Sequence, residues 1–253
     1  MNKISVVIIT FNEEKKILKC LESVKEVADE IVVIDSLSID ATKKICIDFG
    51  VKFIEQPFLG YIEQKNFAVS KSQNEYVLSL DADEALSIEL RNTILGLKGR
   101  LKEFDSYSMN RLTFFNGSWI RHGAWYPDRK IRLFDKSKAE WGGTNPHDKI
   151  LLSNNATNKK IKGDILHYTY DSIGDMVAQN NKFTTIQAKA MYDSGRRATV
   201  LNLIINPFIA FVSGYILKMG FLDGVNGFLI ARSIAYHTLL KYAKLLQHQR
   251  QGF

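Results

Sequence analysis

The chain has 253 residues, which is long enough to bury a substantial core. Of these residues 45% are hydrophobic and 24% are charged, a composition typical of globular proteins and not of disordered ones. The net charge of +7 favours anionic partners, which include nucleotide phosphates, acidic lipid headgroups and nucleic acid. Cys20 and Cys46 fall in expected helices with neither disulfide nor metal-binding spacing, which predicts buried free thiols in a reducing compartment.

The amino-terminal part alternates apolar runs with helical patterns. Residues 4–10 are rich in β-branched side chains, so we expect them to form the first strand. Charged residues follow at 13–16, where a signal peptide would need small residues for cleavage, so we expect a cytoplasmic protein. Further strands are expected at 30–34, 51–54 and 76–80, with helices beginning at residue 12, near 42 and after 60. This alternation predicts a doubly wound α/β layer with a mostly parallel sheet.

Polar residues recur where these strands end. Asp81 and Asp83 end the fourth apolar run, and the ends of the first two strands carry Thr10, Asn12, Glu13 and Asp35. The carboxyl ends of parallel strands form the crevice in which α/β sheets bind ligands, so we expect one cleft there. Paired carboxylates in such a cleft predict Mg²⁺ or Mn²⁺ bound with substrate phosphates, whereas a single acid would serve as a cap for a following helix.

Three segments, 4–14, 30–42 and 80–84, resemble the nucleotide-sugar domain of family 2 inverting glycosyltransferases with the GT-A fold. The resemblance implies a UDP-sugar site whose donor-binding residues are Thr10, Asn12, Glu13, Asp35, Lys65, Asp81 and Arg132. By the same resemblance, Asp35 would bond the uracil ring, Lys65 would lie near the diphosphate and Asp83 would ligate the metal. Ser36 and Leu37 stand where many relatives carry Asp and Gly, which alters the base pocket.

Paired acids also occur in other protein classes. A calcium loop would need Gly at position 86, which is Leu86. A haloacid-dehalogenase-type phosphatase also places Asp-x-Asp after a strand, usually nearer the amino terminus, and stays open as an alternative. So do a polyprenyl-phosphate sugar transferase and an inactive sugar-nucleotide-binding scaffold.

Aromatic and basic residues concentrate at 104–150. Aromatic faces stack on sugars, so we expect Trp125, Tyr126 and Trp141 to bind an acceptor saccharide. The same mixture suits single-stranded nucleic acid, but the upstream motifs favour sugar and we expect no nucleic-acid partner. Residues 125–134 and 145–148 resemble a family 2 subgroup that includes lipopolysaccharide core β-1,4-glucosyltransferases, which implies a sugar such as glucose and a glycolipid acceptor.

An inverting transfer needs one carboxylate to accept the proton of the attacking hydroxyl. We expect Asp148 to be this general base, in a Pro-His-Asp sequence where the subgroup usually has Val-His-Glu. His147 would ligate the metal, or else orient Asp148 or pack, and His167 at the end of another apolar segment is a comparable candidate.

The predicted catalytic domain therefore covers 1–170, with nucleotide-sugar binding at 1–100 and the acceptor side at 101–170. Residues 171–253 are expected to be a helical extension in which 200–219 is long and apolar but interrupted by Asn202, Asn206, Pro207 and Ser213. We expect this helix to lie on the anionic inner face of the cell membrane, with a spanning or homodimer-forming helix, or a helical cap packed on the core, as alternatives.

Overall fold

A computed structural model describes residues 2–144 and 147–251, apart from the side chain of His147. The chain forms two compact units, described separately below: the first contains the residues up to Arg111 and Asp128–Tyr168, and the second contains Leu112–Pro127 and the residues from Thr169 onward. The segment 112–127, expected on the acceptor side of the catalytic domain, thus groups with the carboxyl-terminal helices.

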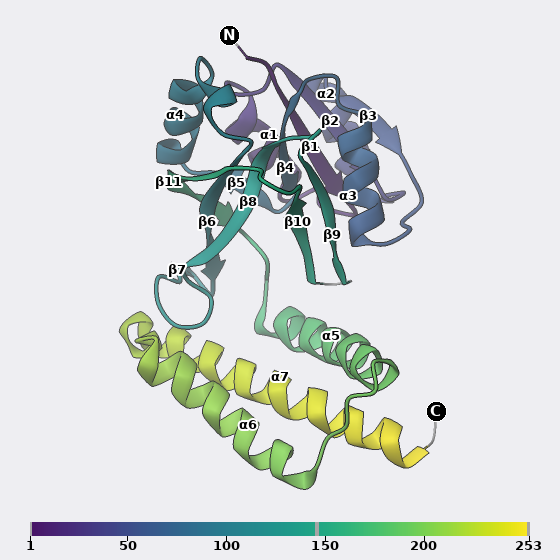
Figure 1. Ribbon diagram of the computed structural model, residues 1–253, viewed down its shortest axis with the longest axis vertical. Coiled ribbons are helices and arrows are strands. Elements are labelled where there is room, and N and C mark those ends of the chain that lie inside the picture. The colour runs from purple at the N-terminus through teal and green to yellow at the C-terminus, as the bar shows by residue number, and fades with distance from the viewer. Residues whose placement is uncertain (1, 145–146, 252–253) are drawn as a thin grey trace. The chain divides into compact units, whose positions relative to one another are not determined.

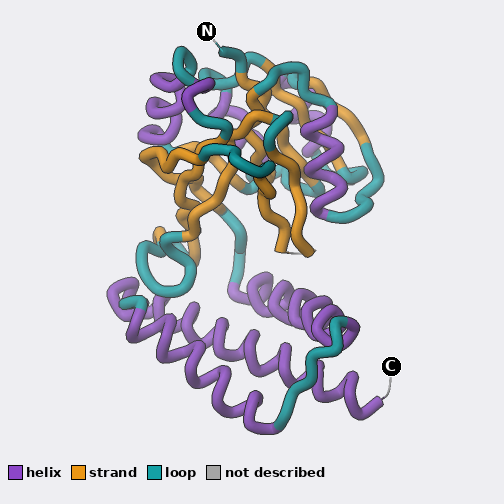
Figure 2. The backbone as a smooth tube through the Cα atoms, in the orientation of Figure 1, coloured by secondary structure: helices purple, strands orange, loops and turns teal. Residues whose placement is uncertain are grey.

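The first unit is built from strands and short helices (Figures 1 and 2). Its strands are β1 Ile4–Thr10, β2 Glu30–Asp35, β3 Lys52–Glu55, β4 Tyr76–Asp81, β5 Glu84–Leu86, β6 Ser106–Phe115 (whose last residues enter the second unit), β8 Asp128–Asp135, β9 Ala139–Thr144, β10 His147–Leu152 and β11 Asn158–His167. Its helices are α1 Ile17–Val24, α2 Thr42–Phe49, α3 Tyr61–Ser70, α4 Ile88–Leu97 and the 3₁₀ turn η1 Leu101–Glu103.

The main sheet has the order β3-β2-β1-β4-β8-β6-β11-β5. The pairs β2–β3, β1–β2 and β1–β4 are parallel, which confirms the predicted α/β layer. Strand β8 pairs antiparallel with β4 and with β6, and β11 pairs antiparallel with β5. A separate antiparallel hairpin joins β9 and β10. The fold is therefore a mixed α/β sheet whose parallel half comes from the first 81 residues.

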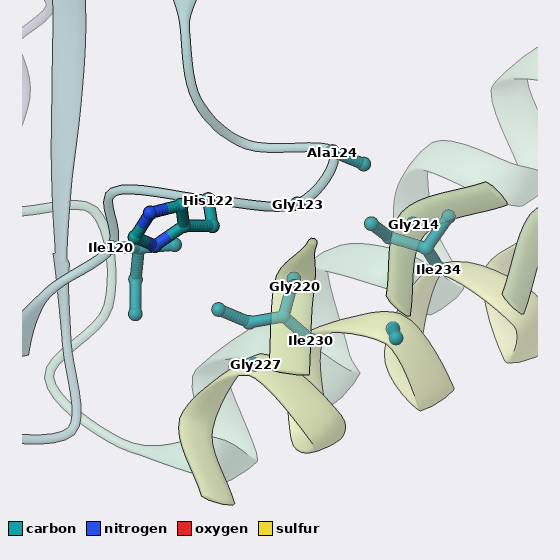
Figure 3. A pocket seen from close by; sticks show the side chains of 10 residues that line it. Ile120, His122, Gly123, Ala124, Gly214, Gly220, Gly227, Ile230 and Ile234 are labelled. Carbon is teal, nitrogen blue, oxygen red and sulfur yellow. The ribbon is translucent and has the colours of Figure 1, made fainter. Parts of the chain in front are cut away.

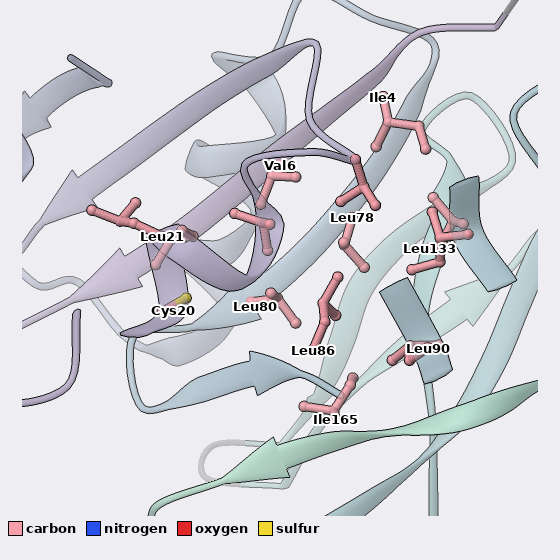
Figure 4. Packing of buried hydrophobic residues seen from close by; sticks show 14 of the residues in the cluster. Ile4, Val6, Cys20, Leu21, Leu78, Leu80, Leu86, Leu90, Leu133 and Ile165 are labelled. Carbon is pink, nitrogen blue, oxygen red and sulfur yellow. The ribbon is translucent and has the colours of Figure 1, made fainter. Parts of the chain in front are cut away.

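Each face of the parallel strands is covered because successive side chains point to opposite faces. Ile4, Val6 and Ile8 of β1 belong to one core cluster, together with residues of α1, α2 and α4 (Figure 4). Val7 belongs to a second cluster, with residues of α3 and of the β9–β10 hairpin. The hairpin thus covers the α3 face of the sheet, where a helix would be expected in a fully parallel fold.

The structure excludes Asp83 as the cap of a following helix: Glu84 begins β5, and Ser87 caps α4 by accepting a hydrogen bond from the amide of Leu90 at 3.2 Å. One helix start was predicted wrongly, since α1 begins at Ile17 instead of residue 12. Both cysteines are buried free thiols, as expected.

The second unit contains the short strand β7 Ser118–Trp119 and three long helices, α5 Ile173–Asp193, α6 Val200–Val212 and α7 Gly224–Gln251. A π-helical turn, η2 Ser213–Leu217, and a 3₁₀ turn, η3 Gly220–Asp223, connect α6 to α7. Helix α7 packs against both α5 and α6 (Figure 1). Asn202 does not interrupt α6 but caps it, since its side chain accepts a hydrogen bond from the amide of Thr199 at 2.8 Å.

The loop 120–124 packs onto the turn between α6 and α7 (Figure 3). Asp223 accepts hydrogen bonds from the amide of Arg121 at 3.0 Å and the amide of His122 at 2.8 Å. The approach is close: a Cβ at Gly123 would lie 3.4 Å from the carbonyl oxygen of Gly214 and 3.4 Å from the Cα of Gly220. The narrow space beside these glycines is lined mainly by apolar groups and backbone.

Candidate functional site

The strand ends that carry polar residues are neighbours in the sheet. In the β1–β2 register Thr10 pairs with Asp35, and in the β1–β4 register Ile9 pairs with Asp81. The carboxyl ends of β2, β1 and β4 therefore meet at one edge, which is where open α/β sheets bind ligands.

The turns that follow β1 and β2 are hydrogen-bonded to each other. The side-chain oxygen of Asn12 accepts a hydrogen bond from the backbone amide of Ile39 at 2.9 Å, and the backbone amide of Asn12 donates to Ser38 Oγ at 2.8 Å. Asp35 is fully buried, and its carboxylate accepts from both the amide and the hydroxyl of Ser38. Asn12 and Asp35 thus fix the conformation of the two turns at this edge of the sheet.

Leu37, in the second turn, has φ of +67°. This is the left-handed region that glycine adopts without steric cost and a leucine does not. The turn therefore has a backbone conformation typical of glycine, and the side chain of Leu37 is 49% exposed.

Lys65 of α3 joins carboxylates from two distant segments. Its ammonium lies 3.0 Å from an oxygen of Asp81 and 2.7 Å from an oxygen of Asp148, and its side chain is 4% exposed. The ammonium also lies 4.3 Å from the ring centroid of Trp141, in cation–π geometry. Because Asp81 ends β4 and Asp148 belongs to β10, this one lysine connects the strand edge to the hairpin.

Asn66 holds the hairpin against α3. Its side-chain amide donates to the carbonyl of Trp141 at 2.9 Å and accepts from the amide of Trp141 at 3.0 Å. This reciprocal pair satisfies the backbone of a strand residue that has no ladder partner on that side. It fixes the hairpin, and with it Asp148, relative to Lys65.

Arg132 of β8 extends the charged cluster. Its Nη2 lies 2.8 Å from Glu84, whose side chain is fully buried, and 3.4 Å from Asp81. Burial by itself would raise the pKa of Asp81, but the nearby charges of Lys65 and Arg132 hold that pKa well below its usual range. Asp81 therefore stays ionised at neutral pH and neutralises part of the basic cluster.

Asp83 lies beside a histidine from the far end of the first unit. Antiparallel pairing of β5 with β11 puts His167 opposite Glu84, and His167 Nε2 lies 3.3 Å from Asp83 Oδ2. Burial opposes ionisation of Asp83, whereas His167 lowers the pKa of this carboxyl below its ordinary value.

Asp83 and His167 form an ion pair with each other, and a carboxylate oxygen and an imidazole nitrogen are both donor types that suit Mn²⁺. Among the described residues no group of three or more His, Cys, Asp or Glu side chains converges on one metal position. Asp83 and His167 would thus supply two ligands and leave other positions for phosphate oxygens and water.

The predicted site residues are not all in one place. Lys65, Asp81, Asp148 and Arg132 form one cluster in the first unit, whereas Trp125 and Tyr126 belong to the second. Trp125 packs with Phe115 and Tyr170 at ring-centroid distances of 5.5 and 5.9 Å, in the core of the second unit.

Trp141 and His147 were also predicted site residues. Trp141 is 4% exposed and carries Lys65 and Arg132 beside its ring, so it differs from the open stacking surface expected of an acceptor-binding residue. The expectation that His147 ligates the metal concerns a side chain outside the described residues.

Sequence reasoning gave no role to Asn66 or Glu84, although both hold the cluster together. Glu84 follows the two aspartates directly, and a third carboxylate in an apolar segment signals a buried cationic partner. No local pattern identifies Asn66, since its partner lies 75 residues away.

A nucleotide-linked substrate is the typical ligand of a parallel α/β sheet with charged residues at its carboxyl edge. The comparisons with known proteins give the family. Residues 5–158 match the family model Glycosyl transferase family 2. The chain belongs to this family and is a glycosyltransferase.

Similar proteins cover nearly the whole chain. The lipopolysaccharide core biosynthesis glycosyltransferase LpsC of Rhizobium meliloti is 30% identical over 250 residues, which are 96% of this chain and 92% of that protein. An uncharacterized glycosyltransferase of Rickettsia typhi is 31% identical over 97% of this chain and 87% of its own length. The match to a crystal structure of S. aureus TarS 1–349 in complex with UDP-GlcNAc covers 99% of this chain and 92% of the TarS chain, with 14% sequence identity and a TM-score of 0.48.

Proposed function

We propose that this glycosyltransferase moves a hexose such as glucose, with inversion, from a UDP-sugar to a saccharide of a bacterial surface glycolipid at the inner face of the cell membrane. The observation that carries the proposal is the Lys65 bridge, which links the donor-side Asp81 to Asp148, the carboxylate chosen as general base. Similarity to LpsC over 96% of the chain supports a lipopolysaccharide core acceptor.

The donor would lie along the edge formed by the ends of β2, β1 and β4. Thr10, Asn12, Glu13 and Asp35 line its nucleoside end. Thr10 Oγ1 is buried without a hydrogen-bond partner among the described residues, which favours a polar ligand at this edge. Lys65 and Arg132 supply the positive charge that a departing diphosphate requires.

Asp83 and His167 would hold the Mg²⁺ or Mn²⁺ ion, with His147 as a further candidate ligand. The bound ion would neutralise charge on the diphosphate as a Lewis acid. Asp81 would keep its ion pairs with Lys65 and Arg132 and would contact the ribose of the donor.

Asp148 would accept the proton from the acceptor hydroxyl as that oxygen attacks the anomeric carbon. The bond to the diphosphate breaks in the same step, so no covalent sugar–enzyme intermediate forms. Its side chain is 13% exposed and hydrogen-bonded by Lys65, which holds the carboxylate in one orientation.

A thermal-shift screen of nucleotides and nucleotide sugars with Mg²⁺ or Mn²⁺ tests the donor, because a ligand that binds only the folded state raises the melting temperature. UDP or a UDP-sugar should give the largest rise, and the rise should need the metal. Equal shifts with GDP, CDP and dTDP would contradict the UDP assignment.

Turnover of the best donor with lipopolysaccharide core acceptors tests the base. Asp148→Asn should keep the UDP-dependent thermal shift and lose most UDP release, while Asp48→Asn, in an exposed ion pair on α2, should retain both. Full activity of Asp148→Asn would remove Asp148 from the mechanism, and absence of turnover in every form would favour the inactive scaffold.

A further inference from the structure

Helix α6 presents a broad apolar face to solvent. No residue of α6 is buried, and the exposed fractions are 64% for Leu201, 65% for Ile204 and 68% for Phe208. The exposed apolar side chains recur at helical spacing and continue through the turn into α7: Val200, Leu201, Ile204, Ile205, Phe208, Ile209, Ile216, Leu217, Met219, Phe221, Leu222 and Val225. We call this set the α6 face. Contiguous exposed apolar area of this kind marks an interaction surface.

The opposite side of α6 is anchored within the second unit. Phe211 lies 6.0 Å from Phe228 of α7 and 5.3 Å from Tyr215 between ring centroids, and Tyr215 lies 5.7 Å from Phe228. The guanidinium of Arg232 lies 6.0 Å from the ring of Phe211. Helix α6 is therefore packed along α7, and the exposed face is the side that this packing leaves uncovered.

The charge of this segment points to an anionic partner. Residues 194–253 contain seven Lys and Arg side chains against one carboxylate, Asp223, and so contribute six of the seven net positive charges of the chain. Arg196 and Arg197 precede α6, and Lys218 follows it. An exposed apolar face with cations at both ends is complementary to the surface of an anionic bilayer.

Length permits two orientations in a membrane. Val200–Leu217 is the one helical stretch among the described residues that is long and apolar enough to span a bilayer, with a mean hydropathy of 1.9 over 18 residues. Its packing partner α7, however, carries Arg232, Lys241 and Lys244, which are costly at the bilayer centre. A helix that stays packed on α7 would lie in the plane of the interface.

We propose that the α6 face docks in plane on an anionic lipid bilayer, with its apolar side chains among the acyl chains and the flanking cations at the phosphates. The surface belongs to the second unit alone, so the proposal does not depend on the nature of the donor or acceptor. Binding to the bilayer would hold the enzyme close to a membrane-embedded acceptor.

Flotation of the full chain with vesicles tests the docking. We expect binding to vesicles of phosphatidylethanolamine with phosphatidylglycerol, and about tenfold weaker binding to phosphatidylcholine vesicles. Ile204→Ser combined with Phe208→Ser should lower the partition coefficient at least about tenfold. The matched control is Ile88→Ser on α4, which removes a 71% exposed isoleucine and should leave partitioning unchanged. Arg196→Gln combined with Arg197→Gln should weaken binding at low salt and have less effect at high salt.

A UDP-dependent thermal shift in each variant shows that the fold and donor site are intact, which separates loss of docking from loss of the proposed function. Failure of the wild-type chain to float with anionic vesicles would overturn the proposal, as would equal flotation of the Ile204/Phe208 variant. A second copy could cover the face instead. In that case sedimentation would show a wild-type dimer that the double variant converts to monomer, without vesicle binding in either form.

Discussion

Replacing Lys65 by methionine removes the cation between Asp81 and Asp148 while keeping most of the side-chain volume. Loss of one partner of a buried ion pair costs about 3–5 kcal/mol. Asp81 and Asp148 are 26% and 13% exposed, and Arg132 remains 3.4 Å from Asp81. These features reduce the loss, so we expect Lys65→Met to lower the free energy of unfolding by about 3 kcal/mol at pH 7.

The loss should depend on pH in one direction. The folded-state pKa of Asp81 is lowered, so its ion pairs stabilise the protein fully above the unfolded pKa of about 3.9 and progressively less as the pH falls below it. The difference between wild type and Lys65→Met should therefore be constant from pH 7 to about 5 and shrink toward pH 3.

Urea denaturation followed by circular dichroism measures both quantities. Lys44→Met is the matched control, since it breaks an exposed i,i+4 pair with Asp48 on α2 and should leave the free energy of unfolding nearly unchanged. A Lys65→Met loss no larger than that of the control, or a loss that grows toward acid pH, would refute the assignment of Lys65 as the bridge between the two carboxylates.

Three further predictions concern other parts of the first unit. Leu37→Gly should raise the free energy of unfolding by up to about 1 kcal/mol, because it relieves a left-handed leucine, and urea melts would show the reasoning wrong if stability fell. Cys20 and Cys46 should resist a thiol-specific reagent at pH 8 until the protein unfolds, because both thiols are buried. Burial, together with the nearby charge of Asp35, raises the pKa of Cys46 to about 12. Rapid labelling of the native protein would contradict this prediction. Asn66→Ala should cost about 2 kcal/mol, because it leaves the amide and carbonyl of Trp141 unsatisfied, and should also lower kcat. An unchanged melt and rate would show that the hairpin is held by other contacts.

The parallel half of the sheet could be predicted from the sequence because its signals are local. The apolar runs at 4–10, 30–34 and 76–80 became β1, β2 and β4 within a residue at each end. The polar residues that follow them meet at one edge because parallel strands share a direction, and the registers of Thr10 with Asp35 and Ile9 with Asp81 show this.

The remainder depends on contacts between distant residues. The pairing of His167 with Asp83 needs β5, a three-residue strand that is too short to be predicted from the sequence. The side chain of Asn66 bonds the backbone of Trp141, and a backbone group can be bonded whatever its side chain is, so local composition does not indicate this contact. Burial of Trp141 likewise follows from the docking of that hairpin on α3, whereas an aromatic residue in a basic segment is equally typical of an exposed stacking surface.

Calorimetric titration of UDP with and without Mn²⁺ tests most directly whether Asp83 and His167 form the metal-dependent donor site. Mn²⁺ should tighten UDP binding to the wild-type chain by about tenfold or more, which corresponds to roughly 1.4 kcal/mol or more. In Asp83→Asn and in His167→Ala the same addition should change Kd by less than about twofold, since the ligand pair is broken. An undiminished effect of Mn²⁺ in both variants would contradict the assignment of this pair as the metal site.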